Sequence, residues 1–253
     1  MTNAYWKTYD GKGAYRQFAN TEVLGWVAHA LAALTFGSYL TNWRAVSSPN
    51  LIVAASLGFA SFGLYLSAIG AFFNNDVFNT AVHAAVGGLW AGLSLIYLPA
   101  SGILSVYTSE TAAKSAPLDL PNALALYLLW WGIAFLVVSF LALKRHINVV
   151  GIALTGSVAL FLLSGAYFNP ASTHFATAVK AGGYFLWLSG LIGAIHFILG
   201  VLTSEKHFIQ IPIGALRGDV NDHHEHHQGP ASAQRPVQSD LELGHGKGSE
   251  HTH

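Results

Sequence analysis

The sequence predicts an all-α, polytopic membrane protein with six transmembrane helices. Hydrophobic residues make up 53% of the 253 residues, and only 9% are charged, whereas a soluble domain has about 25% charged residues. The mean hydropathy is +0.44. The apolar residues gather in six long runs, each near the ~20 residues that cross a bilayer core of ~30 Å. These runs are continuous and do not alternate, which excludes membrane strands.

The six spans are expected over residues 22–43, 51–73, 79–104, 120–143, 147–168 and 182–203. Each break between them carries turn-forming or charged residues, which favour chain reversal over continued helix. The breaks are Ser47-Ser48-Pro49-Asn50, Asn74-Asn75-Asp76, residues 109–121, Lys144-Arg145-His146 and Asn169-Pro170-Ala171-Ser172.

The segments outside the spans differ in composition from them and from one another. Residues 1–21 are interpreted as a cytoplasmic or interfacial segment, because aromatic side chains favour headgroup depth, and they show no cleavable signal peptide. Residues 205–217 are expected to be juxtamembrane. Residues 218–253 are too polar to build a core and are expected to form a disordered, His-rich cytoplasmic tail. The aromatic residues of the first segment are Tyr5, Trp6, Tyr9, Tyr15 and Phe18.

Lysine and arginine positions predict the orientation. Six spans place both termini and the second and fourth loops on one side, and positive charge favours the cytoplasmic side. The opposite side would hold only Arg44, Lys114 and Lys180. Both termini are therefore expected in the cytoplasm. The basic residues of that side are Lys7, Lys12, Arg16, Lys144, Arg145, Lys206, Arg217, Arg235 and Lys247.

Several classes of function find no support in the composition. The chain has no cysteine, which excludes disulfides, thiolate metal sites and cysteine nucleophiles, and its formal net charge of zero gives no reason to expect nucleic acid. No span or long loop holds a nucleophile, paired carboxylates or a metal constellation, so we predict no enzyme, no cofactor and no specific metal site. The histidines of the tail, such as His223 and His224, lack the rigid geometry of such a site.

His29, His83 and His196 lie inside spans one, three and six. Each one alone is typical of a neutral histidine bonded to a neighbouring backbone carbonyl, whereas three together favour a hydrated path. A pair of them would also suit haem, but nothing else in the chain indicates electron transfer. No Asp, Glu, Lys or Arg lies in the middle of a span, which argues against a carboxylate relay and favours a neutral or weakly binding pore.

Five segments of the chain carry recognisable motifs. They are Lys180-Ala181-Gly182-Gly183-Tyr184-Phe185, which runs into the sixth span, Asn20 to Trp26, Phe73 to Ala81, Ala85 to Trp90, and Ala125 to Trp131. Together they resemble the acetate uptake transporter family of GPR1/FUN34/YaaH type. The Lys180 segment resembles the closing signature of that family, whereas Asn20 to Trp26 is a degenerate form of its opening signature, Asn-Pro-Ala-Pro-Leu-Gly-Leu, because both prolines are lost. In Phe73 to Ala81, Asn79 and Thr80 are retained and an acidic residue is replaced by Asn74.

The resemblance implies six helices around a narrow pore in each protomer, assembly into a homo-hexamer in the plasma membrane, and transport of acetate or similar small monocarboxylates, proton-linked or associated with ammonium export. It places the pore constriction at His29, Val86 and a position near Leu162, where an imidazole would make a hydrophobic gate wetter and pH-responsive. The alternative is a hexamer-forming structural protein that has lost transport. The residues expected along the path are Asn20, His29, Tyr65, Asn79, Thr80, Val86, Leu162 and Tyr184.

Overall fold

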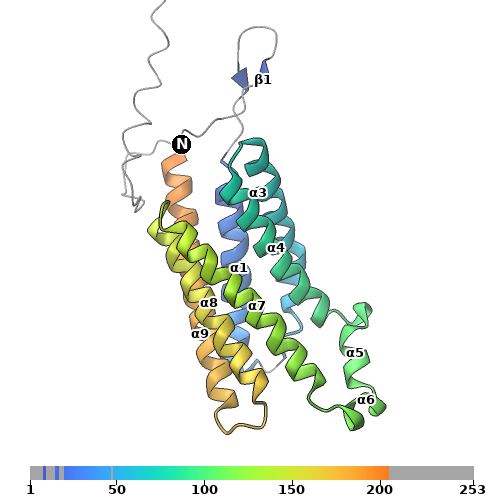
Figure 1. The fold of residues 1–253 in the computed structure, drawn as a ribbon. Helices are drawn as coiled ribbons and strands as arrows, with labels where there is room; N and C mark the ends of the chain where they lie inside the picture. The colour runs from blue at the N-terminus through green and yellow to red at the C-terminus, as the bar shows by residue number, and fades with distance from the viewer. Residues whose placement is uncertain (1–7, 10–14, 17–19, 47, 205–253) are drawn as a thin grey trace, which may run out of the picture. The chain divides into compact units, whose positions relative to one another are not determined.

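The computed structural model describes residues 8–9, 15–16, 20–46 and 48–204. Six helices in this part of the chain are long and apolar enough to cross a membrane (Figure 1). This confirms the predicted all-α membrane fold. The first is α1 (Glu22–Leu40), the second joins α2 (Ile52–Ala55), η2 (Ser56–Ser61) and α3 (Phe62–Phe73), and the others are α4 (Val77–Tyr97), α7 (Asp119–Ala142), α8 (Ile147–Phe168) and α9 (Phe175–Ser204).

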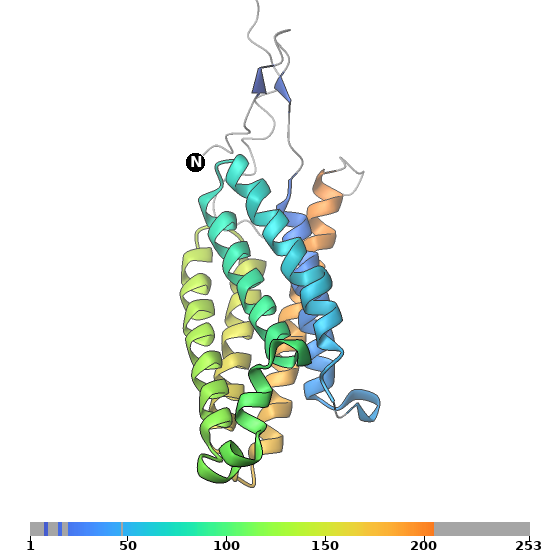
Figure 2. The same cartoon turned by 90° about the vertical axis from the view of Figure 1, so that its right-hand side faces the viewer.

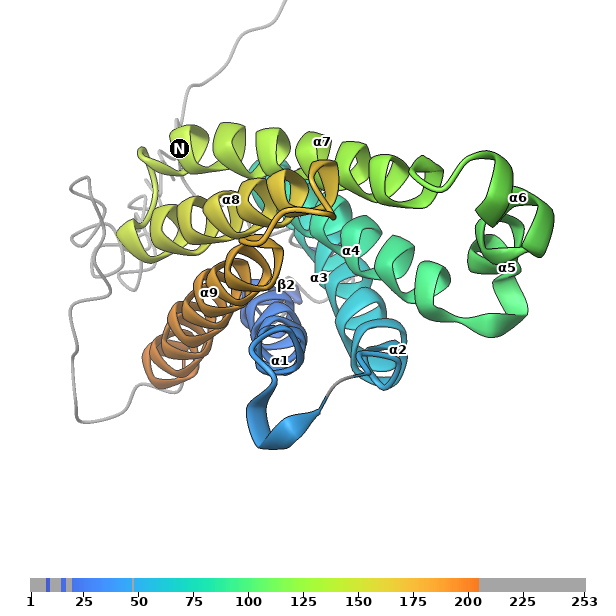
Figure 3. The ribbon, with the colours of Figure 1, turned by 90° about the horizontal axis from the view of Figure 1, so that it is seen from below.

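The long helices surround a common interior in the order α1, α9, α8, α7, α4, α3 (Figure 3). The contact between α7 and α4 includes a hydrogen bond of 3.2 Å from the Tyr127 hydroxyl to the Leu89 carbonyl. The start of α1, the α3–α4 turn, the α7–α8 turn and the end of α9 lie at one end of the bundle (Figures 1 and 2). We call this the Glu22 end.

The third span is shorter than the sequence analysis predicts. Helix α4 ends at Tyr97 instead of residue 104, because Pro99 opens a short 3₁₀ turn, η3 (Pro99–Ser101), and Gly102 takes a positive φ of 70°. Two short helices, α5 (Ile103–Thr108) and α6 (Glu110–Ser115), then lead to α7. The apolar residues beyond Tyr97 extended the hydropathy run, but proline and glycine ended the helix.

The sixth span begins earlier than expected, at Phe175 instead of residue 182. Lys180 and the Gly182-Gly183 pair therefore lie inside α9. Side chains larger than hydrogen would not fit at the two glycine positions, because α9 packs closely on its neighbours. A Cβ atom on Gly183 would lie 2.8 Å from the Leu40 Cβ, and one on Gly37 would lie 2.7 Å from the Gly183 carbonyl oxygen. Small residues that allow such approach are common between membrane helices.

The second span contains a π-helical segment, η2, inside otherwise regular α-helix. Within it, the Ser61 hydroxyl donates to the Ser56 carbonyl five residues earlier, at 2.7 Å. The Ser56 hydroxyl also lies 2.5 Å from the Ser94 hydroxyl of α4. The wider turn thus coincides with a buried polar contact between the second and third spans.

Two short strands precede α1. β1 (Thr8–Tyr9) and β2 (Tyr15–Arg16) form an antiparallel pair, with Tyr9 opposite Tyr15. The remainder of the predicted interfacial segment up to residue 19, the juxtamembrane segment 205–217 and the predicted tail 218–253 lie outside the described residues.

Candidate functional site

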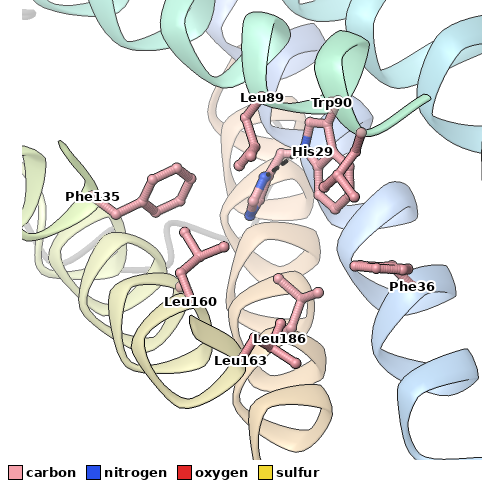
Figure 4. Close-up of a pocket in the computed structure, with 10 residues that line it drawn as sticks. His29, Phe36, Leu89, Trp90, Phe135, Leu160, Leu163 and Leu186 are labelled. Carbon is pink, nitrogen blue, oxygen red and sulfur yellow. Dashed lines mark hydrogen bonds between the residues drawn. The ribbon is translucent and has the colours of Figure 1, made fainter. Parts of the chain in front are cut away.

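A small cavity lies at the centre of the bundle (Figure 4). Its volume is about 10 Å³, the space of about one water. Apart from His29, its lining is apolar, and such a void stays dry. The lining residues are His29 and Phe36 of α1, Leu89, Trp90 and Leu93 of α4, Phe135 of α7, Gly156, Leu160 and Leu163 of α8, and Leu186 of α9.

A second cavity, of about 20 Å³, shares His29 and Phe135 with the first. Their ring centroids are 6.3 Å apart. The two rings thus border both voids, and neither void has room for a solute larger than water. A solute can cross this centre only if side chains move. The second cavity is lined by Trp26, His29, Val82, Ala85, Val86, Trp131, Ala134, Phe135, Val138, Ile152 and Ala153.

His29 has both ring nitrogens in hydrogen bonds. Trp90 Nε1 donates to His29 Nδ1 at 3.3 Å, and an indole nitrogen can only donate. Nδ1 is therefore unprotonated. Ser189 Oγ lies 3.1 Å from His29 Nε2 and donates its own proton to the Ile152 carbonyl at 2.9 Å, so Nε2 carries the hydrogen. The surrounding bonds fix one neutral tautomer, and His29 presents only its ring to the cavities.

A second group of histidines surrounds Trp26 toward the Glu22 end. The indole meets the rings of His83 and His196 edge-on, with centroids 5.0 and 5.7 Å away, and that of His29 at 6.4 Å. Trp26 Nε1 donates to Glu22 Oε1 at 3.0 Å. His196 Nε2 lies 3.4 Å from the same oxygen. The carboxylate of α1 therefore orients the indole and links α1 to α9.

Asp76 joins the other side of the Glu22 end. Its carboxylate accepts two bonds from the Arg145 guanidinium, at 2.9 and 3.1 Å, which connects the start of α4 to the α7–α8 turn. It also caps α4, accepting from the Asn79 backbone N–H at 3.2 Å and from Asn79 Nδ2 at 2.8 Å. This capping acid suits the positive end of the helix dipole. Asp76 thus supplies a carboxylate two positions after Asn74, where the resemblance leads us to expect an acidic residue.

His83 lies between α1, α3 and α4. Ser67 Oγ is 2.8 Å from His83 Nδ1 and donates to the Thr21 carbonyl at 2.5 Å. Because the hydroxyl has one proton, Nδ1 must be the donor to Ser67. In the neutral imidazole, His83 Nε2 is then an unprotonated acceptor, and it is buried without a hydrogen-bond partner among the described residues. Gly25 makes room for this ring, because a Cβ there would lie 2.6 Å from His83 Cε1.

The structure brings together only some of the residues expected along the path. His29 and Val86 line cavities, but Leu160 and Leu163 occupy the position expected for Leu162, which is half-buried beside them. Asn79 is buried at the Glu22 end, and the Thr80 hydroxyl bonds its own helix through the Asp76 carbonyl at 2.7 Å. The other three lie elsewhere: Asn20 is exposed and accepts from the Glu22 backbone N–H, and Tyr65 and Tyr184 are 41% and 63% exposed.

Sequence reasoning missed the aromatic partners of His29 and the serine that completes its bonds. Trp90 and Leu93 follow Val86 at the spacing of one helix face, so a helical projection from Val86 would have found them. Phe135 and Ser189 carry no such signal, because nothing local shows which face of α7 or α9 is turned inward. Glu22 was taken as a span boundary, although its first-turn position allows contact with Trp26 one turn later.

The model of the GPR1/FUN34/yaaH family matches residues 11–217. The chain belongs to this family. The match extends across all six long helices, from before α1 to beyond α9. It confirms the resemblance that the motifs indicated.

Curated relatives and one solved structure agree with this membership. Acetate permease A of Emericella nidulans is 24% identical over 200 residues, covering 78% of this chain and 66% of the relative. Acetate transporter protein patA of Penicillium expansum is 26% identical, covering 79% and 78%. Ammonia transport outward protein 2 of Saccharomyces cerevisiae is 25% identical, covering 79% and 67%. The matched part of the chain thus covers 66–78% of the length of these relatives.

The fold also matches the structure of the bacterial acetate channel SatP, with a TM-score of 0.64 over 78% of this chain and 100% of that chain. At 17% sequence identity, this likeness establishes the shared six-helix architecture and leaves the solute to be argued from the site.

Proposed function

We propose that this family member carries acetate or similar small monocarboxylates across a membrane. The observation that supports this most directly is the central constriction, where His29 and Phe135 border two small, largely apolar voids inside a six-helix protomer. A hydrophobic constriction of this kind passes a small solute when it widens and rehydrates briefly. Two relatives named as acetate transporters add to the proposal.

The wider setting is part of the same proposal. We expect homo-hexamers in the plasma membrane, with both termini in the cytoplasm. The Glu22 end would then face the cytoplasm, because it holds Lys144 and Arg145, while Arg44 and Lys114 lie toward the opposite end. This distribution follows the positive-inside rule. Proton linkage and ammonium movement remain part of the proposal through the family, and the yeast relative named for ammonia transport is in keeping with them.

The test is uptake of radiolabelled acetate into proteoliposomes that hold the purified full chain, with and without an inward proton gradient. Saturable uptake above that of empty vesicles is expected, with competition from propionate and less from longer acids. A stimulation by the gradient would establish proton linkage. Absence of uptake by well-folded, reconstituted protein would contradict the proposal.

A further inference from the structure

Asn79, a buried asparagine of the Glu22 end, shares the unusual feature of His83. Asn79 Nδ2 donates to the Asp76 carboxylate, which can only accept, so the orientation of the amide is fixed. The carbonyl oxygen Oδ1 is left buried, without a hydrogen-bond partner among the described residues. Buried polar atoms in proteins are nearly always hydrogen-bonded. Two such atoms on one helix therefore need an explanation.

The two residues lie near each other on α4. Asn79 and His83 are four residues apart on α4, a spacing that places Cβ atoms about 5–6 Å apart on one helix face. Asn79 is 2% exposed and His83 is 0% exposed. Val82 and Val86, which line the second cavity, belong to the same buried stripe of α4. The pair thus extends from the Glu22 end toward the central voids along this stripe.

Both free atoms are hydrogen-bond acceptors, and the charged groups bonded to Asn79 and to Trp26, the ring beside His83, are carboxylates. Their hydrogen-bond roles follow from fixed partners, Ser67 for His83 and Asp76 for Asn79. Glu22 lies beside Trp26, whose ring contacts His83. The guanidinium of Arg145, a cation at this end, already donates two hydrogen bonds to the Asp76 carboxylate. A carboxylate anion would find acceptors where it needs donors.

We infer that His83 Nε2 and Asn79 Oδ1 form a binding site for a small hydrogen-bond donor without negative charge. Two sources fit this chemistry: the N–H groups of ammonium and the O–H group of an un-ionised carboxylic acid. The site deepens the proposed transport function, since it would select the charge state of a passing solute. It does not depend on it, because binding can be measured in a protein that does not transport.

The site is separate from the central constriction. His29 has both nitrogens bonded to Trp90 and Ser189, so it offers no free acceptor to a solute. Trp26 separates the two positions, with His83 and His29 both in contact with its ring. A solute would therefore exchange hydrogen bonds at His83 and cross the apolar centre without them.

The experiment is ¹⁵N NMR of the full chain, labelled at histidine side chains and reconstituted in lipid nanodiscs. The His83 resonance is assigned by its loss in His83→Phe, and His29 serves as the internal control. Ammonium chloride is titrated against matched sodium chloride. Sodium acetate is titrated at a pH above and a pH near the acetic acid pKa, each against ligand-free protein at that pH.

A saturable shift of His83 Nε2 with ammonium, or with acetate only at the lower pH, is expected, while the His29 signals stay in place. The two arms identify the donor. Asn79→Leu should weaken that binding about tenfold, the value of one good hydrogen bond. A shift with acetate at the higher pH, or no shift with any probe because only water occupies the site, would overturn the inference, as would an unchanged affinity in Asn79→Leu.

Discussion

The Glu22 end and the centre of the bundle both contain buried histidines, but they use them differently. In the centre, His29 has both ring nitrogens engaged, and its ring borders apolar voids. At the Glu22 end, His83 keeps one nitrogen without a partner among the described residues, and the carboxylates of Glu22 and Asp76 link helices at the same end.

The contrast teaches that residue type alone does not define a polar path. A histidine whose bonds are completed by its neighbours behaves as part of a barrier, because it has nothing left to offer a solute. A histidine with a free acceptor remains available for binding. The centre therefore limits passage by size and dryness, and the Glu22 end by hydrogen bonding.

The largest effect is expected from filling the centre. A Cβ on Gly156 would lie 2.7 Å from Phe135 Cδ1, so Gly156→Leu should force a side chain into the cavity, cost about 1–3 kcal/mol by overpacking and reduce acetate uptake to background. Gly165→Leu on the same helix is the matched control, because nothing lies within 4 Å of its Cβ position. Gly156→Ala adds a smaller side chain at the same position, so it tests the same cavity if Gly156→Leu fails to fold. Normal uptake by folded Gly156→Leu would show that solute does not pass this cavity.

Removing the polar atoms of His29 tests whether its hydrogen bonds or only its ring shape contribute to stability and to the pH dependence of uptake. His29→Phe leaves the buried Trp90 N–H without an acceptor, which should cost about 1–3 kcal/mol and shift thermal unfolding to lower temperature. His29→Gln can accept from Trp90 and donate to Ser189, so it should recover most of that stability. If uptake by the two variants shows the same pH profile as the parent chain, protonation of His29 has no part in gating.

Breaking the Asp76–Arg145 pair should have a moderate effect. Both side chains are partly exposed, 19% and 37%, so Arg145→Ala should cost about 1–2 kcal/mol, below the value for a fully buried pair. The matched control is Lys114→Ala, which breaks an exposed pair with Glu110 and should cost less than about 0.5 kcal/mol. Thermal unfolding in detergent measures both. Equal effects would mean that the Glu22 end is not held by this ion pair.

The smallest effect is expected at Tyr184. This side chain is 63% exposed on α9, so Tyr184→Leu should change stability by less than about 0.5 kcal/mol and leave acetate uptake unchanged. A clear loss of uptake would instead support its predicted place along the path. The same uptake assay used for Gly156→Leu provides the measurement.

The class of the protein and most of its helices can be read from the order of the amino acids. The predicted fifth span coincides with α8, Ile147–Phe168, because hydropathy measures how long a run can remain in lipid and the flanking polar residues end it on both sides. The family followed from short motifs for a similar reason, since residues such as Asn79 and the Gly182-Gly183 pair are local in the chain. Pro99 and Gly102 also indicate the end of α4, although the apolar residues around them lead us to predict a longer helix.

Which side chains meet in the interior depends on how the helices pack against one another. Hydropathy is nearly uniform around a membrane helix, so it cannot fix the rotation of that helix about its axis. Close approach at glycines such as Gly156 and Gly183 sets that rotation and brings Leu160, rather than Leu162, to the cavity. The bonding of His29 and His83 likewise depends on serines 160 and 16 residues away, because a hydrogen bond between helices requires both backbones to be in place first.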